Sequence, residues 1–473
     1  MGRSTPDWDG LQGGLAGDVV LPESEEYEWA RKPFIARFDE LQPRAIVRCL
    51  SPEDVAEVIA FARRHGFDTA TRSGGHCLAG YSSTRGILID VTAMRSVAVS
   101  EGVARVGAGI RTGELGACLF EHGLAIPAGT CPSVGIAGLT LGGGLGILGR
   151  AHGLTLDHLL GAQIVLADGR VVECDEYREP DLFWALRGAG AGNFGVVTSL
   201  TFAPLPAPRM TSFHLVWAYE HAAPVIAAWQ QWAPPAPDEL SADLVLTATA
   251  DPADEPSVEV YGAVVGSERD ARELLDALAA RAGSDPLSED CRELSYRDTC
   301  AYQAELSVAY DQVEQTPPGP IFRQGYRVTK SEFFTHPLPR EAIAALVDTF
   351  ANSGAPGRTR SVGFAPWGGA YNRRSADATA FVHRDQLFLL EHLILVDPES
   401  SPAEKLAARE WATRSWASVH RWGAGRVYPC FPDADLDDWG RAYYGENYAR
   451  LTQVKAHYDP DNVFRFRQSI PLR

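Results

Sequence analysis

The spacing of hydrophobic residues predicts helices and short strands in alternation over the first part of the chain. Residues 51–65 (SPEDVAEVIAFARRH) begin with a serine that can cap a helix, place acidic residues in the first turn, and repeat apolar side chains at helical spacing. Residues 112–122 have the same spacing, and Gly123 follows where helices commonly end. The apolar runs at 86–91 and 103–108 are typical of strands.

A hairpin and another short helix complete this part of the chain. Within residues 161–173 (GAQIVLADGRVVE), Asp168 and Gly169 predict a tight turn with positive φ angles between two strands. Residues 181–188 (DLFWALRG) predict a short helix. The sequence PLPAP at 204–208 interrupts the pattern and predicts a domain boundary.

The pattern changes in the region from about 209 to 424. Apolar and polar residues alternate with period two at 241–249 and 386–396, which is typical of strands, while 268–282 and 340–352 are amphipathic at helical spacing. This combination predicts an antiparallel sheet with helices on one face.

The C-terminal residues 436–455 predict a further helix, rich in aromatic side chains. Tyr443, Tyr444 and Tyr448 stand at helical spacing within it, so we expect most of them to pack in a core. The chain of 473 residues is too long for one compact core. We therefore predict an α+β protein of two domains.

Composition and charge exclude several classes of function. The net charge of −18 makes nucleic-acid binding improbable, because an acidic surface repels phosphate backbones. The N-terminus lacks the apolar stretch of a signal peptide, and no run reaches the roughly 20 apolar residues of a membrane helix. The eight cysteines contain no CxxC pair, so we expect no metal site and mostly reduced, buried thiols in a cytoplasmic protein.

Glycine is concentrated in three segments of the first 200 residues. These are 72–83 (RSGGHCLAGYSS), 127–146 (PAGTCPSVGIAGLTLGGGLG) and 186–195 (LRGAGAGNFG). None has the Gly-Lys-Ser/Thr of a P-loop, and none makes a convincing Rossmann fingerprint. Three such segments flanked by strands are best explained by a long ligand whose pyrophosphate lies across exposed backbone N–H groups.

Two reactive side chains lie in these segments. His76 follows Ser-Gly-Gly, and Cys131 lies between Ala-Gly-Thr and Pro. Either residue alone would be interpreted as structural. Together, the motifs R-S-G-G-H-x-x-x-G-Y-S at 72–82 and A-G-x-C-P-S-V-G at 128–135 resemble the attachment sites of the berberine bridge enzyme-like oxidases, which belong to the vanillyl-alcohol-oxidase superfamily.

The resemblance extends through much of the chain. It covers 87–99, 142–172, 181–202 and 443–471, and is patchy in the middle region. It implies FAD bound covalently through His76 to the flavin 8α-methyl and through Cys131 to ring carbon C6. It also implies an FAD-binding domain made of residues 1–205 and 425–473, with a substrate domain at 206–424. The further cofactor-binding residues that it implies are Arg72, Ser73, Gly74, Gly75, Cys77, Gly80, Tyr81, Ser82, Gly129, Thr130, Val134, Gly135, Gly138, Leu139, Gly142, Gly143, Gly144, Gly146, Gly192, Asn193, Gly195, Val196, Val197 and Asn462.

The catalytic base departs from the family pattern. Hydride removal from an alcohol carbon requires a partner that accepts the hydroxyl proton. Many relatives have a Tyr where this chain has Phe431, so the candidates are Tyr428, Glu391 and His392. Glu391 and His392 are neighbours on a predicted strand and point to opposite faces, so only one can face the flavin. The alignment favours Glu391, although both could be polar residues at a seam between sheet and helix.

The resemblance implies an oxidase that transfers a hydride from a small organic substrate to FAD and electrons to O2. Val134 stands where the family has an oxygen gate, and a β-branched residue there favours peroxide production, although packing explains Val134 equally well. The alternatives are a dehydrogenase with another electron acceptor, and a flavoprotein that binds a metabolite without turnover. Relatives oxidise sugars, glycosylated polyketides, alkaloids and other secondary metabolites, so the substrate stays open.

Overall fold

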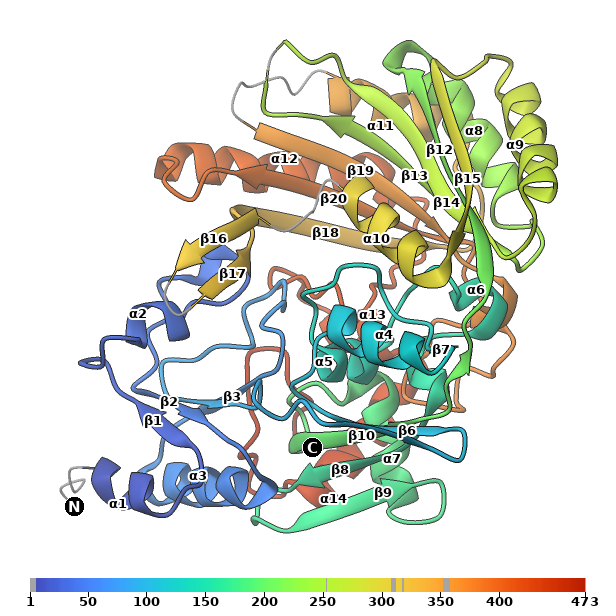
Figure 1. Ribbon diagram of the computed structural model, residues 1–473. Coiled ribbons are helices and arrows are strands. Elements are labelled where there is room, and N and C mark those ends of the chain that lie inside the picture. The colour runs from blue at the N-terminus through green and yellow to red at the C-terminus, as the bar shows by residue number, and fades with distance from the viewer. Residues whose placement is uncertain (1–5, 252, 308–311, 317–318, 352–357, 473) are drawn as a thin grey trace.

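The computed structural model describes residues 6–251, 253–307, 312–316, 319–351 and 358–472, and only the backbone of 312–316 and 319–322. Its elements form two groups, with a seven-stranded sheet in one group and two smaller sheets in the other (Figure 1). This arrangement confirms the predicted α+β fold. Within the described part of the chain, no helix is both long and apolar enough to cross a membrane.

Two sheets form the framework of the first group. In the first sheet three strands run parallel to one another, and a fourth strand pairs antiparallel at one edge. Helix α3 connects two of the parallel strands. The second sheet is antiparallel throughout. In spatial order the strands are β1 (Asp18–Val20), β2 (Ala45–Arg48), β4 (Ile87–Asp90) and β3 (Thr69–Arg72), then β5 (Val97–Ser100), β6 (Val103–Gly107), β10 (Val196–Phe202), β8 (Leu159–Val165) and β9 (Val171–Asp175).

The helices of this group follow the predicted pattern. Ser51 caps α3 by accepting a hydrogen bond from the Asp54 amide, and Gly66 ends the helix in the left-handed conformation. The predicted C-terminal helix is interrupted at Gly445, which has a φ of 49°. The helices are α1 (Trp8–Gly13), α2 (Tyr27–Ala30), α3 (Pro52–His65), α4 (Thr112–Glu121), α5 (Ile136–Gly142), α6 (Gly149–His152), α7 (Pro180–Ala189), α13 (Trp439–Tyr444) and α14 (Tyr448–Tyr458).

The predicted hairpin forms, with a different turn. β8 and β9 pair antiparallel, but only Gly169 has a positive φ, at 86°. The Gly169 amide donates to Leu166 O and the Leu166 amide to Arg170 O, which makes the loop longer than a two-residue turn. Because a single left-handed residue suffices in such a loop, Asp168 keeps an ordinary backbone.

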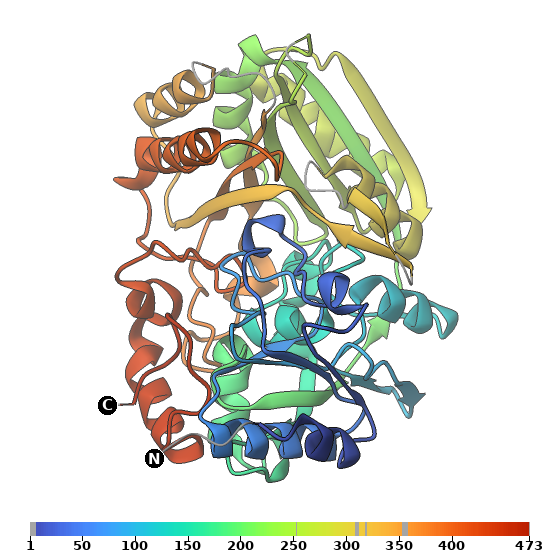
Figure 2. The same ribbon diagram turned by 90° about the vertical axis from the view of Figure 1, so that its left-hand side faces the viewer.

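The C-terminal segment completes the first group. Tyr443, Tyr444 and Leu451 belong to the same hydrophobic core as both smaller sheets, as expected for the tyrosines. Figure 2 shows this segment running along the side of the group.

The second group is built on an antiparallel seven-stranded sheet. Its strands, in spatial order, are β15 (Ser288–Ser295), β12 (Arg209–Ala218), β14 (Ser257–Val264), β13 (Leu240–Ala248), β19 (Arg358–Pro366), β20 (Phe388–Val396) and β18 (Tyr326–Phe334). Two small ladders pair β7 (Leu124–Ala125) with β11 (Leu205–Pro206), and β16 (Gln312–Thr316) with β17 (Gly319–Arg323).

Helices cover mainly one face of this sheet, which we call the outer face. The outer helices are α8 (Ala222–Trp232), α9 (Glu268–Ala282), α11 (Arg340–Ala351) and α12 (Pro402–His420). The predicted end of α11, Asn352, lies outside the described residues. The prediction of helices on one face was incomplete, because α10 (Tyr296–Leu306) lies between the sheet and the first group (Figure 1). The Tyr296 hydroxyl donates to Ile126 O in the first group.

The period-two alternation determines which side chains face the first group. On β13, Leu244 and Leu246 pack with the outer helices, so Asp243 and Val245 point to the other face, which we call the inner face. On β20, Leu390 packs outward in the same way. The inner face therefore carries the odd-numbered residues of β13 and β20.

The connection between β19 and β20 returns to the first group. The Trp184 indole donates to Asp377 O at 2.8 Å, and Arg384 forms a buried ion pair with Asp157 at 2.8 Å. The segment 367–387 therefore packs against residues of the N-terminal part, although it lies within the region predicted as the second domain.

Arg150 joins the two groups. Its guanidinium is 1% exposed and donates to Leu240 O, Pro234 O and Ala236 O at 2.8–3.1 Å, and also to Trp367 O. A buried charge whose donors are all satisfied is strongly destabilising to disrupt.

We expect Arg150→Met to lower the free energy of unfolding by about 3–5 kcal/mol, because four carbonyl groups lose their donors. Urea unfolding followed by tryptophan fluorescence would measure this. Arg105→Met at an exposed ion pair serves as the matched control. An equal, small effect of both substitutions would contradict the structural role of Arg150.

Candidate functional site

Two glycines bring His76 and Cys131 together. A Cβ atom on Gly74 would lie 2.1 Å from the Gly135 amide nitrogen, and one on Gly135 would lie 2.2 Å from the Gly74 nitrogen. The loops after β3 and before α5 therefore make backbone contact that no larger residue permits. This contact places the two predicted attachment residues side by side, although they belong to separate segments of the sequence.

Ser133 links the two side chains directly. Its hydroxyl lies 2.8 Å from His76 Nε2 and 3.5 Å from Cys131 Sγ, and the side chain is 1% exposed. The other imidazole nitrogen, Nδ1, lies 2.8 Å from Gly74 O. Phe34 stacks on the ring at a centroid distance of 3.6 Å. The imidazole is thus held at both nitrogens and on one face.

The environment keeps His76 neutral. Burial lowers the pKa of His76 to about 3, and the charges of Arg111 and Arg327 act in the same direction. A neutral imidazole has a nitrogen lone pair available for bond formation, as a nucleophile requires. The predicted chemistry at His76 is therefore compatible with its surroundings.

The loop after His76 offers polar groups that find no partner within the described chain. The hydroxyls of Tyr81, Ser82 and Ser83 are buried and make no hydrogen bond there. Backbone N–H groups of residues 79–82 converge on the Cys77 thiol, whose pKa is raised by burial. Converging amides beside free hydroxyls fit the pyrophosphate of a dinucleotide, so the predicted residues of this loop suit FAD.

The glycines of 142–146 form a tight loop against Tyr428. A Cβ on Gly143 would lie 2.8 Å from the Tyr428 ring, and one on Gly144 would lie 2.0 Å from the Thr155 hydroxyl. The Tyr428 hydroxyl accepts hydrogen bonds from the amides of Gly144 at 2.8 Å and Leu145 at 3.0 Å.

Tyr428 is therefore poorly suited to act as the base. Its oxygen already accepts two amides, and burial raises its pKa well above the usual value. A phenol that burial keeps protonated cannot take up a further proton from a substrate. The ring of Phe431 packs edge-on against Tyr428 at 5.1 Å, so this segment fills the space below the loop.

Three predicted cofactor residues have side chains committed to the protein itself. Arg72 donates to Ala30 O and Arg31 O at 2.6 and 2.7 Å, and Ser73 donates to Ala108 O at 2.7 Å. Asn193 is satisfied by Ala189 O and the Ile470 amide. These side chains hold the loops in shape through bonds within the protein.

The remaining predicted cofactor residues differ in surroundings. A methyl group on Gly138 would meet no neighbouring atom within 4 Å among the described residues, so this side of α5 is open. Val196 and Val197 are buried in β10, inside the five-stranded sheet. Asn462 has a φ of 51° and a buried Oδ1 without a partner in the described chain, which leaves it free for a ligand.

Glu391 and His392 point to opposite faces, as predicted. His392 is fully buried on the outer face, where Nδ1 lies 2.8 Å from the Ser415 hydroxyl of α12. His392 was therefore wrong as a candidate base. Glu391 lies on the inner face and accepts a hydrogen bond from Arg327 at 2.6 Å.

Arg327 connects the base candidate to the attachment residues. Its guanidinium bonds Glu391 and also contacts Gln324 and Thr329, and its charge reaches His76. Arg327 thus holds Glu391 while its charge reaches His76, which brings the base candidate and the attachment residue into one electrostatic neighbourhood.

Sequence reasoning missed Ser133, Phe34 and Arg327. Ser133 lies inside the motif A-G-x-C-P-S-V-G, and its spacing of two from Cys131 was an available signal. Phe34 and Arg327 belong to distant segments joined by the pairing of Ile35 with Gln324. Nothing local in the sequence indicates that pairing.

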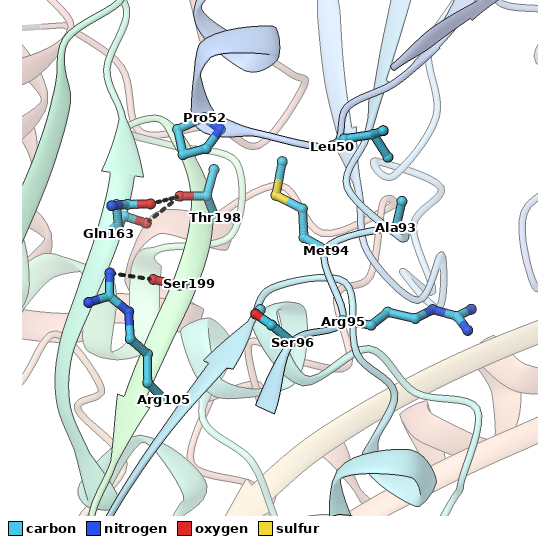
Figure 3. Close-up of a pocket in the computed structure, with 11 residues that line it drawn as sticks. Leu50, Pro52, Ala93, Met94, Arg95, Ser96, Arg105, Gln163, Thr198 and Ser199 are labelled. Carbon is cyan, nitrogen blue, oxygen red and sulfur yellow. Dashed lines mark hydrogen bonds between the residues drawn. The ribbon is translucent and has the colours of Figure 1, made fainter. Parts of the chain in front are cut away.

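A hollow of about 340 Å³ at the surface lies elsewhere, between the two smaller sheets (Figure 3). Its polar groups already bond one another, as Thr198 does with Gln163 at 2.9 Å and Arg105 with Ser199 at 3.4 Å. None of the predicted site residues lines it. This hollow does not contribute to the candidate site.

We expect Ser133→Ala to slow covalent flavin attachment about threefold to tenfold, because one hydrogen bond that orients His76 is worth about 0.5–1.5 kcal/mol. The measurement is the fraction of flavin that stays with the protein after acid denaturation, followed over time. Ser73→Ala, which loses a bond to backbone only, is the control. Unchanged attachment in Ser133→Ala would contradict this role.

Two family profiles match the chain. The profile described as FAD binding domain matches residues 43–175, and the one described as berberine and berberine like matches 427–471. The uncharacterized FAD-linked oxidoreductase YgaK of Bacillus subtilis (strain 168) is 33% identical over 97% of both chains. Berberine bridge enzyme-like 1 of Arabidopsis thaliana is 30% identical, over 96% of this chain and 90% of its own.

Similarity also extends to proteins with named substrates. Tetrahydroberberine oxidase of Berberis wilsoniae is 28% identical, over 91% of this chain and 85% of its own. The solved glucooligosaccharide oxidase of Acremonium strictum, described with a 6-S-cysteinyl, 8α-N1-histidyl FAD, is 28% identical. Its structure covers 98% of this chain and 99% of its own with a TM-score of 0.87.

Proposed function

Because this chain belongs to the berberine bridge enzyme-like family of FAD-linked oxidases, we propose that it oxidises a small sugar-like or alkaloid-like metabolite with an FAD attached through both His76 and Cys131. The observation that carries this proposal is the hydrogen-bonded link His76–Ser133–Cys131, which lies across from Glu391 and Arg327. The chemistry that a bound FAD supplies is hydride acceptance from the substrate carbon and electron delivery to O2.

The two attachment residues hold the cofactor from one edge. Both imidazole nitrogens of His76 carry a hydrogen bond; attachment through Nδ1 would require loss of the proton that Nδ1 shares with Gly74 O and would leave the bond between Nε2 and Ser133 in place. The loop at 79–82 binds the pyrophosphate through its amides and free hydroxyls. Phe34 keeps the His76 ring from turning.

Glu391 is the base of the proposed reaction. Its carboxylate accepts the substrate hydroxyl proton, and Arg327 holds it in one orientation through the 2.6 Å bond. The polar atoms of Arg327 are otherwise engaged by Gln324 and Thr329, so the guanidinium stays in place during proton transfer.

We propose O2 as the electron acceptor because Val134, a β-branched residue, stands where the family has an oxygen gate. None of the eight cysteines, all of which lie among the described residues, forms a disulfide, which supports a reducing, cytoplasmic location.

An anaerobic substrate panel tests the proposal. Sugars and alkaloids that are substrates bleach the flavin absorbance, and readmitted air restores it with one peroxide per turnover. Dye reduction without peroxide would point to a dehydrogenase. Binding without bleaching by any panel member would contradict an enzymatic function.

A further inference from the structure

The inner face of the large sheet has a depression beside Glu391. The neighbour of Glu391 on β19 is Gly363, which in turn pairs with Val245 on β13. Ala365 is the next inward residue of β19, so two small residues occupy the middle strand. A methyl on Gly363 would meet only Val245, at 3.8 Å, so the space above it is open. We call this depression the Gly363 hollow.

A second carboxyl borders the Gly363 hollow on the side away from Glu391. Asp243 points inward from β13, and its register partner on β14 is Tyr261. The strands of Asp243 and Glu391 lie two spacings apart, roughly 10 Å. No hydrogen bond or ion pair to Asp243 is formed within the described chain, whereas Glu391 has Arg327.

A further polar side chain of the inner face is buried without a hydrogen-bond partner among the described residues. Ser331 pairs with Glu391 in the ladder, is 2% exposed, and its hydroxyl has no partner among the described residues. Buried polar groups of folded proteins are almost always satisfied. Unsatisfied groups gathered on one face of a proposed active site are best explained by a ligand that completes them.

The charge around the Gly363 hollow is unbalanced. It has two carboxyls, Asp243 and Glu391, and one cation, Arg327, which is already engaged. The groups that face Asp243 are Tyr261, Glu391 and Tyr371, and none of them is a cation. Asp243 is half-buried, and an ionised carboxylate that loses water to a ligand without gaining a counter-ion is destabilised.

We propose that Asp243 binds a protonated nitrogen of the substrate, so that the enzyme selects amine-bearing metabolites held across the Gly363 hollow from Glu391. The ammonium supplies the missing counter-ion beside Tyr261, while the Ser331 hydroxyl lies on the Glu391 side, where it can bond the far part of the substrate. This inference rests on the proposed function and narrows its substrate class. A neutral polyol leaves Asp243 without a counter-ion.

The protonation of Asp243 makes the proposal sensitive to pH. Burial, with the nearby charge of Glu391, raises the pKa of Asp243 to about 7. The carboxyl is therefore mostly neutral at pH 6 and mostly ionised at pH 8. For an amine that stays protonated through pH 8, such as 1,2,3,4-tetrahydroisoquinoline, affinity is expected to rise about tenfold between these values, because only the ionised form of Asp243 pairs with a cation.

Calorimetric titration of the holoenzyme with two matched pairs of probes tests the proposal. The amines are 1,2,3,4-tetrahydroisoquinoline and the disaccharide of glucosamine, and their neutral counterparts are isochroman and the N-acetylated disaccharide. At least one amine is expected to bind tenfold or more tightly than its counterpart at pH 8. Failure of both amines to exceed their counterparts would overturn the proposal.

Substitution identifies the residue. Asp243→Asn keeps the shape and is expected to abolish the preference for the amine and its pH dependence, while neutral probes bind within threefold. Glu259→Gln, an inner-face acid already bonded to His214 at 2.9 Å, is the control and keeps the preference. If Asp243→Asn fails to fold, the pH dependence of amine binding to the unmodified protein decides whether the proposal holds. Calorimetry measures binding and does not depend on turnover. A preference for amines without bleaching of the flavin would therefore refute the proposed oxidation and leave this inference standing.

Discussion

The variant His76→Ala/Cys131→Ala is expected to release all of its flavin on denaturation, whereas the unmodified protein stays yellow. Each single variant keeps one link and therefore retains attached flavin. The physical reason is that the two side chains are joined through Ser133 and reach adjacent positions, so either one alone still reaches the ring edge. Mass spectrometry of the denatured chains measures attachment directly.

Cys430→Ala is the matched control for this experiment. Cys430 lies beside Gly142, near the same loops, and donates a weak hydrogen bond to Leu139 O at 3.5 Å. We expect this variant to retain the full mass of the attached cofactor. Flavin that stays bound to the denatured double variant would refute the assignment of both residues.

Glu391→Gln is expected to lower the rate of anaerobic flavin reduction by about 10²–10⁴-fold, the range typical for loss of a general base. The amide keeps the shape of the carboxylate and can still accept the hydrogen bond from Arg327. The effect should therefore appear in the chemical step, measured by stopped-flow absorbance, with substrate affinity little changed.

His392→Asn provides the comparison, because His392 is the next residue on the same strand and points the other way. We expect it to lower stability through the lost contact with Ser415 while the rate of flavin reduction stays within about threefold. A rate within tenfold of the unmodified protein in Glu391→Gln would exclude Glu391 as the base.

Much of the fold was predictable because local rules dominate it. Helix α3 begins after Ser51 as its cap predicts, and the alternation along β20 correctly separates Glu391 from His392. The turn at Gly169 is longer than predicted, and Asp168 lacks the predicted positive φ. These features depend on residues close together in the sequence, so spacing alone indicates them.

The errors have a common physical origin in contacts between distant segments. Tyr428 was a plausible base until the structure placed the amides of Gly144 and Leu145 on its oxygen. Asp243 resembles any polar residue of an alternating strand, and only the sheet order shows that it borders the Gly363 hollow. The spacing of residues along the sequence does not show which distant segments contact one another in the fold.

The backbone contact between Gly74 and Gly135 has a further consequence if the proposed double attachment forms. His76 and Cys131 become neighbours only when both loops have docked, since the contact depends on the folded arrangement. A chain that carries both bonds must therefore have passed through the folded state, and it keeps that mark even after it is unfolded. The proportion of doubly linked chains in a preparation thus records the folding history of the population.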